Sequence, residues 1–91
     1  MKKYVYVLLE TGSWDYEPSC SVEIFKDFDV ALTHFEQKII EAKIEMKNWI
    51  DEDDIDEDKI IDKDYASYEI SETGDFTRLH NSLTITREEV K

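Results

Sequence analysis

The sequence predicts an α+β domain in which an antiparallel sheet of about four strands packs one face against a single long amphipathic helix. Short segments of alternating apolar residues flank a longer segment whose apolar residues recur every three or four positions. The chain has 91 residues, enough for one domain with one core. We therefore treat residues 1–91 as a single domain with the element order β-β-α-β-β.

Four segments carry the strand pattern. They are residues 3–10, 20–25, 65–70 and 83–90. The first is apolar on both faces, which is typical of a strand with neighbours on both sides. Gly12 and Pro18 predict that residues 11–19 form a loop between the first two strands. The second strand is expected to run antiparallel to the first.

The helix is predicted from Asp27 to Ile50. Its apolar positions recur at steps of four and three, at Phe28, Leu32, Phe35, Ile39, Ala42, Met46 and Trp49. Asp27, or failing that Asp29, suits the N-cap. Ile40 and Ile44 widen the apolar stripe beyond that of a coiled coil, as expected for a helix that lies on a sheet.

Residues 51–64 form an acidic run, DEDDIDEDKIIDKD, with nine acids and two lysines. We predict that it is an acidic connection between the helix and the third strand. In a purely structural role it is solvated and attached to the core by its isoleucines. In a functional role its carboxylates replace phosphates and occupy a basic groove of a nucleic-acid-binding protein. The candidate partner-binding residues of the run are Asp51, Glu52, Asp53, Asp54, Asp56, Glu57 and Asp58.

Two aromatic residues in the first predicted loop, Trp14 and Tyr16, are further candidates for partner binding. Exposed aromatic side chains supply much of the binding energy of protein interfaces. A loop tryptophan can also fold back over the edge of a sheet, in which case it has a structural role only. Both interpretations stay open at this point.

The charge of the chain restricts its partners. Twenty-three acidic residues stand against eleven lysines and arginines, and the formal net charge is -12. Such a protein repels nucleic acids and anionic membranes and is attracted to basic protein surfaces. Cys20 is the single cysteine, and no apolar segment is long enough for a signal peptide or a membrane span. We therefore expect a cytoplasmic protein with a basic, nucleic-acid-binding protein as its partner.

No pattern of a catalytic, cofactor or metal site is present. Cys20, His34 and His80 are the only soft metal ligands, and they lack zinc-site spacing. Cys20 shares an alternating face with Val22 and Ile24, so we expect it to be buried. The acidic run fails as a calcium loop, because lysine and tyrosine stand where glycine and glutamate are needed. We expect no enzymatic activity, no cofactor and no bound metal.

The chain resembles small proteins of unknown function from bacteria and their phages. The resemblance is carried by a strand rich in tyrosine and valine, a helix start with Phe25, Asp27, Ala31 and Phe35, the acidic middle and the terminal strand. Proteins of this size and charge in phages include anti-CRISPR proteins and other nucleic-acid mimics. The resemblance implies an inhibitor of a host defence nuclease and names no site residues.

Two functional hypotheses follow from these observations. The first is a non-enzymatic acidic protein, of phage or mobile-element type, that binds and inhibits the nucleic-acid-binding surface of a protein such as a CRISPR effector. The alternative is a structural or regulatory domain that assembles through a sheet edge or its aromatic loop. In that case the charge serves solubility only.

Overall fold

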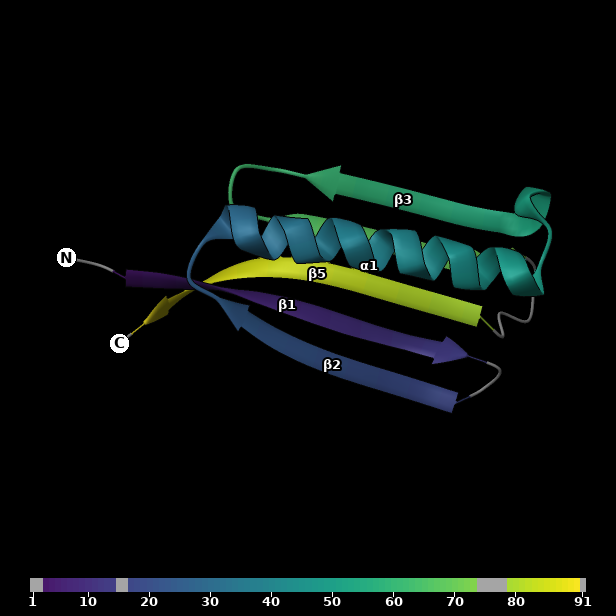
Figure 1. The fold of residues 1–91 in the computed structure, drawn as a ribbon, viewed down its shortest axis with the longest axis horizontal. Coiled ribbons are helices and arrows are strands. Elements are labelled where there is room, and N and C mark those ends of the chain that lie inside the picture. Colours follow the sequence, from purple (N-terminus) through teal and green to yellow (C-terminus); the bar gives the residue numbers. More distant parts are fainter. Residues whose placement is uncertain (1–2, 15–16, 74–78, 91) are drawn as a thin grey trace.

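The structure, a computed structural model, describes residues 3–14, 17–73 and 79–90. Within them it has two layers, a five-stranded antiparallel sheet and one helix that lies along one face of it (Figure 1). The elements are β1 (Lys3–Trp14), β2 (Glu17–Phe25), α1 (Phe28–Trp49), the short 3-10 helix η1 (Glu52–Asp54), β3 (Ile55–Ile61), β4 (Ala66–Glu72) and β5 (Leu79–Val90). The strand order is β2-β1-β5-β4-β3. The α+β class and the single long helix are confirmed.

The core lies between α1 and the middle of the sheet. Its buried apolar side chains come from α1 and from β1, β4 and β5: Leu8, Ala31, Phe35, Ile39, Ala42, Met46, Ala66, Tyr68, Ile70, Leu79, Leu83 and Ile85. Alternate residues of β5 are buried because successive side chains of a strand point to opposite faces. The opposite face of the sheet is not covered by α1, so we call it the open face.

The bounds of the helix follow the prediction, but Ile40, Ile44 and Trp49, which were expected to belong to its apolar stripe, are 59%, 58% and 57% exposed. Asp27 is its N-cap residue, in an extended conformation, and its carbonyl oxygen accepts a hydrogen bond from the Ala31 backbone N–H at 3.1 Å. The Asp27 side chain makes no capping hydrogen bond. The helix ends at Trp49, and the Ile50 backbone N–H donates to the Met46 carbonyl at 3.0 Å. Both predicted ends of the helix are therefore confirmed.

The sheet has one strand more than the sequence predicts, because β3 lies inside the acidic run that we expected to be a connection. β3 forms an edge of the sheet and pairs only with β4. Charged side chains are tolerated at an edge, where they stay in water and discourage pairing with other chains. On the side that faces α1, Lys59 Nζ lies 2.8 Å from Glu36 Oε2. An edge strand as charged as β3 therefore has the same composition as a solvated loop, which is why the sequence pattern did not predict it.

The connection between β1 and β2 is much shorter than the predicted loop of residues 11–19. β1 continues to Trp14 and β2 begins at Glu17, with Gly12 opposite Ser19 and Ser13 opposite Pro18 in the register. Proline is accepted here because β2 is an edge strand, so one side of its backbone needs no hydrogen bonds. Pro18 thus lies within a hairpin strand and does not mark a loop.

The burial predicted for the second strand is wrong. Glu23 stands opposite the buried Leu8, so Ser21, Glu23 and Phe25 face α1. Cys20, Val22 and Ile24 lie on the open face, and all three are exposed. Val22 is 56% exposed and Ile24 is 66% exposed. The alternation of apolar residues does not show which face of a strand the helix covers. Glu23 can face α1 because it forms an ion pair there with Lys38.

Gly12 lies on β1 next to β5, with no room for a side chain. It stands opposite Asn81 in the register. A Cβ atom at Gly12 would lie 2.6 Å from the His80 carbonyl oxygen and 3.2 Å from Asn81 Nδ2. Any larger residue would therefore force the two strands apart.

Replacing Gly12 by alanine is expected to lower the free energy of unfolding by about 2 kcal/mol, because overpacking of a closely packed site typically costs 1–3 kcal/mol. Urea denaturation followed by circular dichroism measures the change. Ser13→Ala, at the neighbouring position on the open face, is the matched control and should have little effect. A Gly12→Ala variant as stable as the wild type would show that the strands can separate without cost.

Candidate protein-interaction site

Six exposed carboxylates follow one edge of the molecule, and we call them the acidic edge. They are Asp51, Asp53, Asp54, Asp56, Asp58 and Glu69. The first three belong to η1 or directly precede it, the next two lie on β3, and Glu69 lies on β4. Within the described ranges, none of the six has an ion-pair partner. The acidic edge is therefore free to receive cations from another molecule.

Three of these carboxylates meet on the open face. Asp58 stands directly opposite Glu69, and Asp56 stands opposite Ser71. These four residues, together with Glu57, line a shallow hollow of about 320 Å³. Like charges directly opposite each other destabilise a pair of strands. A bound cation would relieve this repulsion.

Glu57 differs from the other candidates of the acidic run, because it faces α1. Tyr68 Oη donates a hydrogen bond to Glu57 Oε2 at 2.5 Å, and Lys43 Nζ lies 3.1 Å from the same oxygen. Burial alone would raise the pKa of the Glu57 carboxyl, but these two donors outweigh it and lower the pKa below its usual range. Its interactions therefore stabilise the fold at neutral pH and are lost as the pH falls through the lowered pKa. Glu57 holds β3 to the helix and is not part of the acidic edge.

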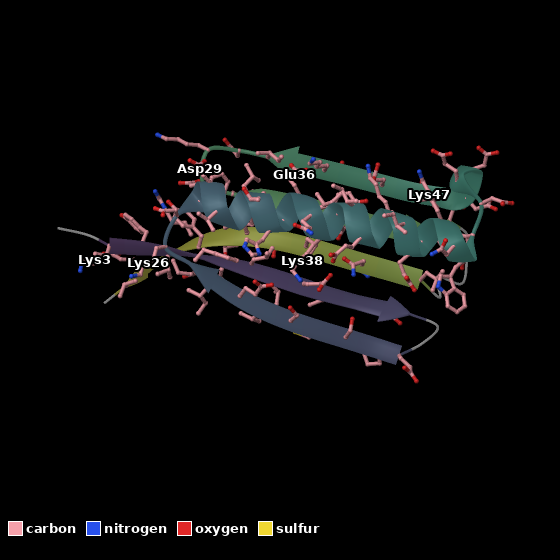
Figure 2. The ribbon with its side chains drawn as sticks, in the orientation of Figure 1. Lys3, Lys26, Asp29, Glu36, Lys38 and Lys47 are labelled. Atoms are coloured by element: carbon pink, nitrogen blue, oxygen red, sulfur yellow. The ribbon has the colours of Figure 1, made fainter. Side chains whose placement is uncertain are left out.

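Glu52 is exposed, and its Oε1 lies 3.8 Å from Lys47 Nζ. Both side chains are mostly in water, so this ion pair contributes little to stability. Lys47 lies near the end of α1 that adjoins η1 (Figure 2). Lys47 thus partly balances the charge of Glu52, whereas Asp51 and Asp53 have no ion-pair partner among the described residues.

Trp14, one of the two aromatic candidates, lies at the same end of the molecule as the start of the acidic run. β1 ends at the end of the long axis at which η1 lies (Figure 1). Trp14 is the last residue of β1 and stands opposite Glu17 and Leu79 in the register. Tyr16 lies outside the described residues. The end of β1 at Trp14 and the acidic edge are nevertheless separated across the sheet, because β1 and β3 are not neighbours.

The soft ligands do not come together. Cys20 is exposed on β2. His34, on α1, packs against the Phe25 ring at a centroid distance of 4.7 Å, and its Nδ1 lies 3.8 Å from Glu23 Oε2. His80 stands on β5 opposite Ser13. In the part of the chain that the structure describes, no group of three potential ligands could hold a metal ion.

A second polar cluster, on the other flank of α1, was not predicted. Lys38 Nζ lies 3.4 Å from Glu10 Oε1 and 3.4 Å from Glu23 Oε1, and Asn81 Nδ2 donates to Glu10 Oε2 at 3.4 Å. Burial alone would lower the pKa of the Lys38 ammonium, but the two carboxylates outweigh it and raise the pKa. Two features of the sequence could have indicated this cluster. Lys38 directly precedes the apolar helix position Ile39, and Glu10 is a charged residue at the end of the predicted apolar strand of residues 3–10.

Comparison of the chain with models of protein families, with curated proteins and with solved structures finds no match. Among the described residues, no helix is both long enough and apolar enough to cross a membrane.

The contact between Tyr68 and Glu57 predicts a dependence of stability on alkaline pH. Burial, and then the hydrogen bond and charge of Glu57, raise the pKa of the Tyr68 phenol. Above the ordinary tyrosine pKa of about 10 the unfolded state loses a proton that the folded state keeps, so stability falls as the pH rises. The raised pKa of Lys38 acts in the same direction.

Tyr68→Phe is expected to lower the free energy of unfolding at neutral pH by about 1.5 kcal/mol, the usual contribution of a hydrogen bond to a charged group. Its stability should also fall less steeply at alkaline pH than that of the wild type. Denaturant unfolding across a pH series measures both effects. Tyr65→Phe, which changes an exposed tyrosine, is the control. Identical alkaline profiles for Tyr68→Phe and the wild type would contradict the role of this contact.

Proposed function

We propose that the protein binds the basic, nucleic-acid-binding surface of another protein through its acidic edge and thereby blocks that surface, without catalysing a reaction. The observation that carries the proposal is the set of six exposed carboxylates that have no ion-pair partner among the described residues. Carboxylates that serve the fold, such as Glu57 and Glu10, are paired with lysines. The acidic edge has no such internal role.

The charge of the chain supports the same partner chemistry. A net charge of -12 attracts basic surfaces over long distances and accelerates the encounter with them. The lysines and arginines that hold a phosphate backbone are the cations that the acidic edge would engage. Binding is therefore expected to compete with nucleic acid and to weaken as salt rises, because salt screens exposed charges.

A narrower form of the proposal follows from the resemblance to small phage proteins. Its target would be the RNA- or DNA-binding groove of a CRISPR effector nuclease in the cytoplasm of the bacterial host. Purified effector complexes provide a direct assay, because an inhibitor of this kind reduces both nucleic-acid binding and cleavage.

The partner can be identified by capture from a bacterial lysate on the immobilised protein at low salt, with mass spectrometry of the bound proteins. Treating the lysate with nuclease distinguishes a protein contact from a nucleic-acid bridge. Each captured protein is then purified and tested for competition between this chain and RNA or DNA. A partner whose binding is insensitive to both nucleic acid and salt would contradict the proposal.

The triple variant Asp53→Asn, Asp56→Asn and Asp58→Asn is expected to fold normally, because all three side chains are exposed. Its affinity for the partner should fall at least about ten-fold, since three charges of the interface are removed. Isothermal titration calorimetry at two salt concentrations measures the loss and the change in salt dependence.

The matched control removes the same charge from exposed positions outside the acidic edge, with Glu17→Gln, Glu88→Gln and Glu89→Gln. It should bind with nearly the affinity of the wild type. Equal losses in the two variants would mean that only net charge matters, and no specific acidic edge would then exist.

A second candidate function, assembly through a sheet edge, is supported by β2 and the open face beside it. Val22 and Ile24 are exposed there, and Leu9 beside them is 37% exposed. Contiguous exposed apolar residues on a sheet next to an unpaired strand edge are typical of association sites. This patch lies at the opposite edge of the sheet from β3, so the acidic edge does not oppose contact there.

If this patch causes self-association, sedimentation velocity over a concentration series should show a dimer whose fraction falls in the variant Val22→Thr and Ile24→Thr. Ile60→Thr, which changes an exposed isoleucine on β3, is the control. A single monomeric species at every concentration would eliminate this second function and leave the first untouched.

A further inference from the structure

The two edges of the sheet differ in composition. β3 forms one edge, and Asp56, Asp58 and Lys59 place charges along it, which is a common protection of an edge strand against pairing with other chains. β2 forms the other edge. Its residues 19–25 include one charged residue, Glu23, and no lysine. The edge of β2 is therefore unprotected along most of its length.

The backbone of β2 offers free hydrogen-bonding groups on its outer side. Proline lacks the N–H that a paired position needs, so within an edge strand it faces outward. The backbone groups of a strand point to alternate sides, and Cys20, Val22 and Ile24 follow Pro18 at every second position. Their N–H and C=O groups therefore point away from β1, which is the one neighbour of β2 among the described strands. Figure 1 shows no other described element beside this edge.

The side chains of the same three residues form an exposed row on the open face. Cys20 is exposed, and Val22 and Ile24 are 56% and 66% exposed. Leu9, opposite Val22 on β1, is exposed as well. An added strand would lay every second side chain along this row. Apolar side chains at those positions would remove apolar surface from water on both molecules.

The side of β2 that faces α1 favours a basic side chain. Glu23 lies there, and its Oε1 is 3.4 Å from Lys38 Nζ. Lys38 Nζ is also 3.4 Å from Glu10 Oε1, so with His34 neutral one lysine balances two carboxylates and the group keeps a net charge of -1. A residue of an added strand that stands opposite Glu23 would lie on the same side, within reach of this charge.

We propose that an extended segment of the basic protein partner pairs with β2 as a sixth strand of the sheet. Its apolar side chains cover the open face beside Val22 and Ile24, and a lysine or arginine between them lies beside Glu23. In complexes of this kind main-chain hydrogen bonds to the sheet edge give the affinity, and side chains at alternate positions give the specificity. A second copy of this chain is the less suitable occupant, because it would bring a further charge of -12 to the interface.

This inference rests on the proposed function, because it assumes a basic partner, and it adds a second contact to that of the acidic edge. The two sites lie at opposite edges of a sheet about 19 Å wide, a distance that about six extended residues span. Nucleic-acid-binding proteins often carry basic arms outside their folded part. One such arm would reach β2 while the folded part of the partner stays on the acidic edge.

The test uses amide hydrogen exchange, measured by NMR on the full, isotope-labelled chain. The probe is a short peptide of alternating valine and lysine, acetylated and amidated at its ends. In the free chain the amides of Cys20, Val22 and Ile24 should exchange fast, and saturating peptide should slow them at least about ten-fold, because their N–H groups become paired. The amides of Ser21 and Glu23, which already face β1, are the internal reference and should change little.

Two controls separate strand pairing from attraction between opposite charges. The same peptide methylated at every backbone nitrogen keeps its charge but cannot donate to a strand, so it should slow none of these amides. In the protein, Val22→Pro removes an N–H on the free side of β2 and should weaken binding of the peptide at least about ten-fold, whereas Val22→Thr, which keeps the N–H, should weaken it less than about three-fold. Circular dichroism verifies that both variants are folded. The comparison of the two peptides on the wild-type chain decides the question even if Val22→Pro does not fold.

Three results would overturn the inference. The first is unchanged exchange at β2 at every peptide concentration, and the second is an equal effect of the two peptides. The third is exchange of the three amides that is slow without peptide and slows further as the protein concentration rises, which would mean that a second copy occupies the edge.

The peptide experiment needs no partner, so its outcome is independent of the capture experiment. A partner that depends on the acidic edge, combined with unchanged exchange at β2, would refute this inference and keep the proposed function. Slowed exchange at β2, without any partner that competes with nucleic acid, would refute the proposed function and keep β2 as a strand-pairing site.

Discussion

The apolar contact between α1 and the middle of the sheet constrains the rest of the structure. A helix with its side chains is about 10 Å wide, whereas five strands spaced about 4.8 Å apart span about 19 Å. One helix cannot cover such a sheet, and β2 and β3 contribute no fully buried apolar side chain to the described core. Beyond the apolar core, ion pairs connect α1 to the neighbouring strands. Lys38 reaches β1 and β2, and Lys43 reaches β3.

The helix was predicted well, whereas β3 and the covered face of β2, which depend on residues distant in the sequence, were not. The helix was found because Phe35, Ile39 and Met46 must all face the sheet. β3 was missed because its helix-facing positions include Glu57 and Lys59, whose partners lie on α1 and β4. The faces of β2 were exchanged because Glu23 is neutralised by Lys38, fifteen positions later in the sequence. In each case a residue distant in the chain decides the local structure.

The residues of the candidate site also divide into those that the local sequence predicts and those that only the fold brings together. The acidic run is visible in the sequence and contains five residues of the acidic edge, among them Asp53 and Asp56, whereas Glu69 lies on β4 and was not a candidate. The exception of Glu57 depends on the alternation of a strand that had not been predicted. The polar cluster on the other flank of α1 joins Glu10, Lys38 and Asn81 from three different elements. No spacing rule connects such residues; the register of β1 with β5 places Glu10 near Asn81, and the packing of α1 on the sheet adds Lys38.

The pairing of β1 with β5 has a consequence for how the chain folds. These strands stand near opposite ends of the described chain, yet Lys3 faces Val90 and Trp14 faces Leu79 across the middle of the sheet. Contacts so distant in sequence close a large loop, which slows folding. During synthesis the β1–β2 hairpin and α1 are made first, but β1 keeps one unpaired edge until β5 has left the ribosome. The nascent chain must therefore stay unaggregated without its central strand, and its dense negative charge is well suited to keep neighbouring nascent chains apart.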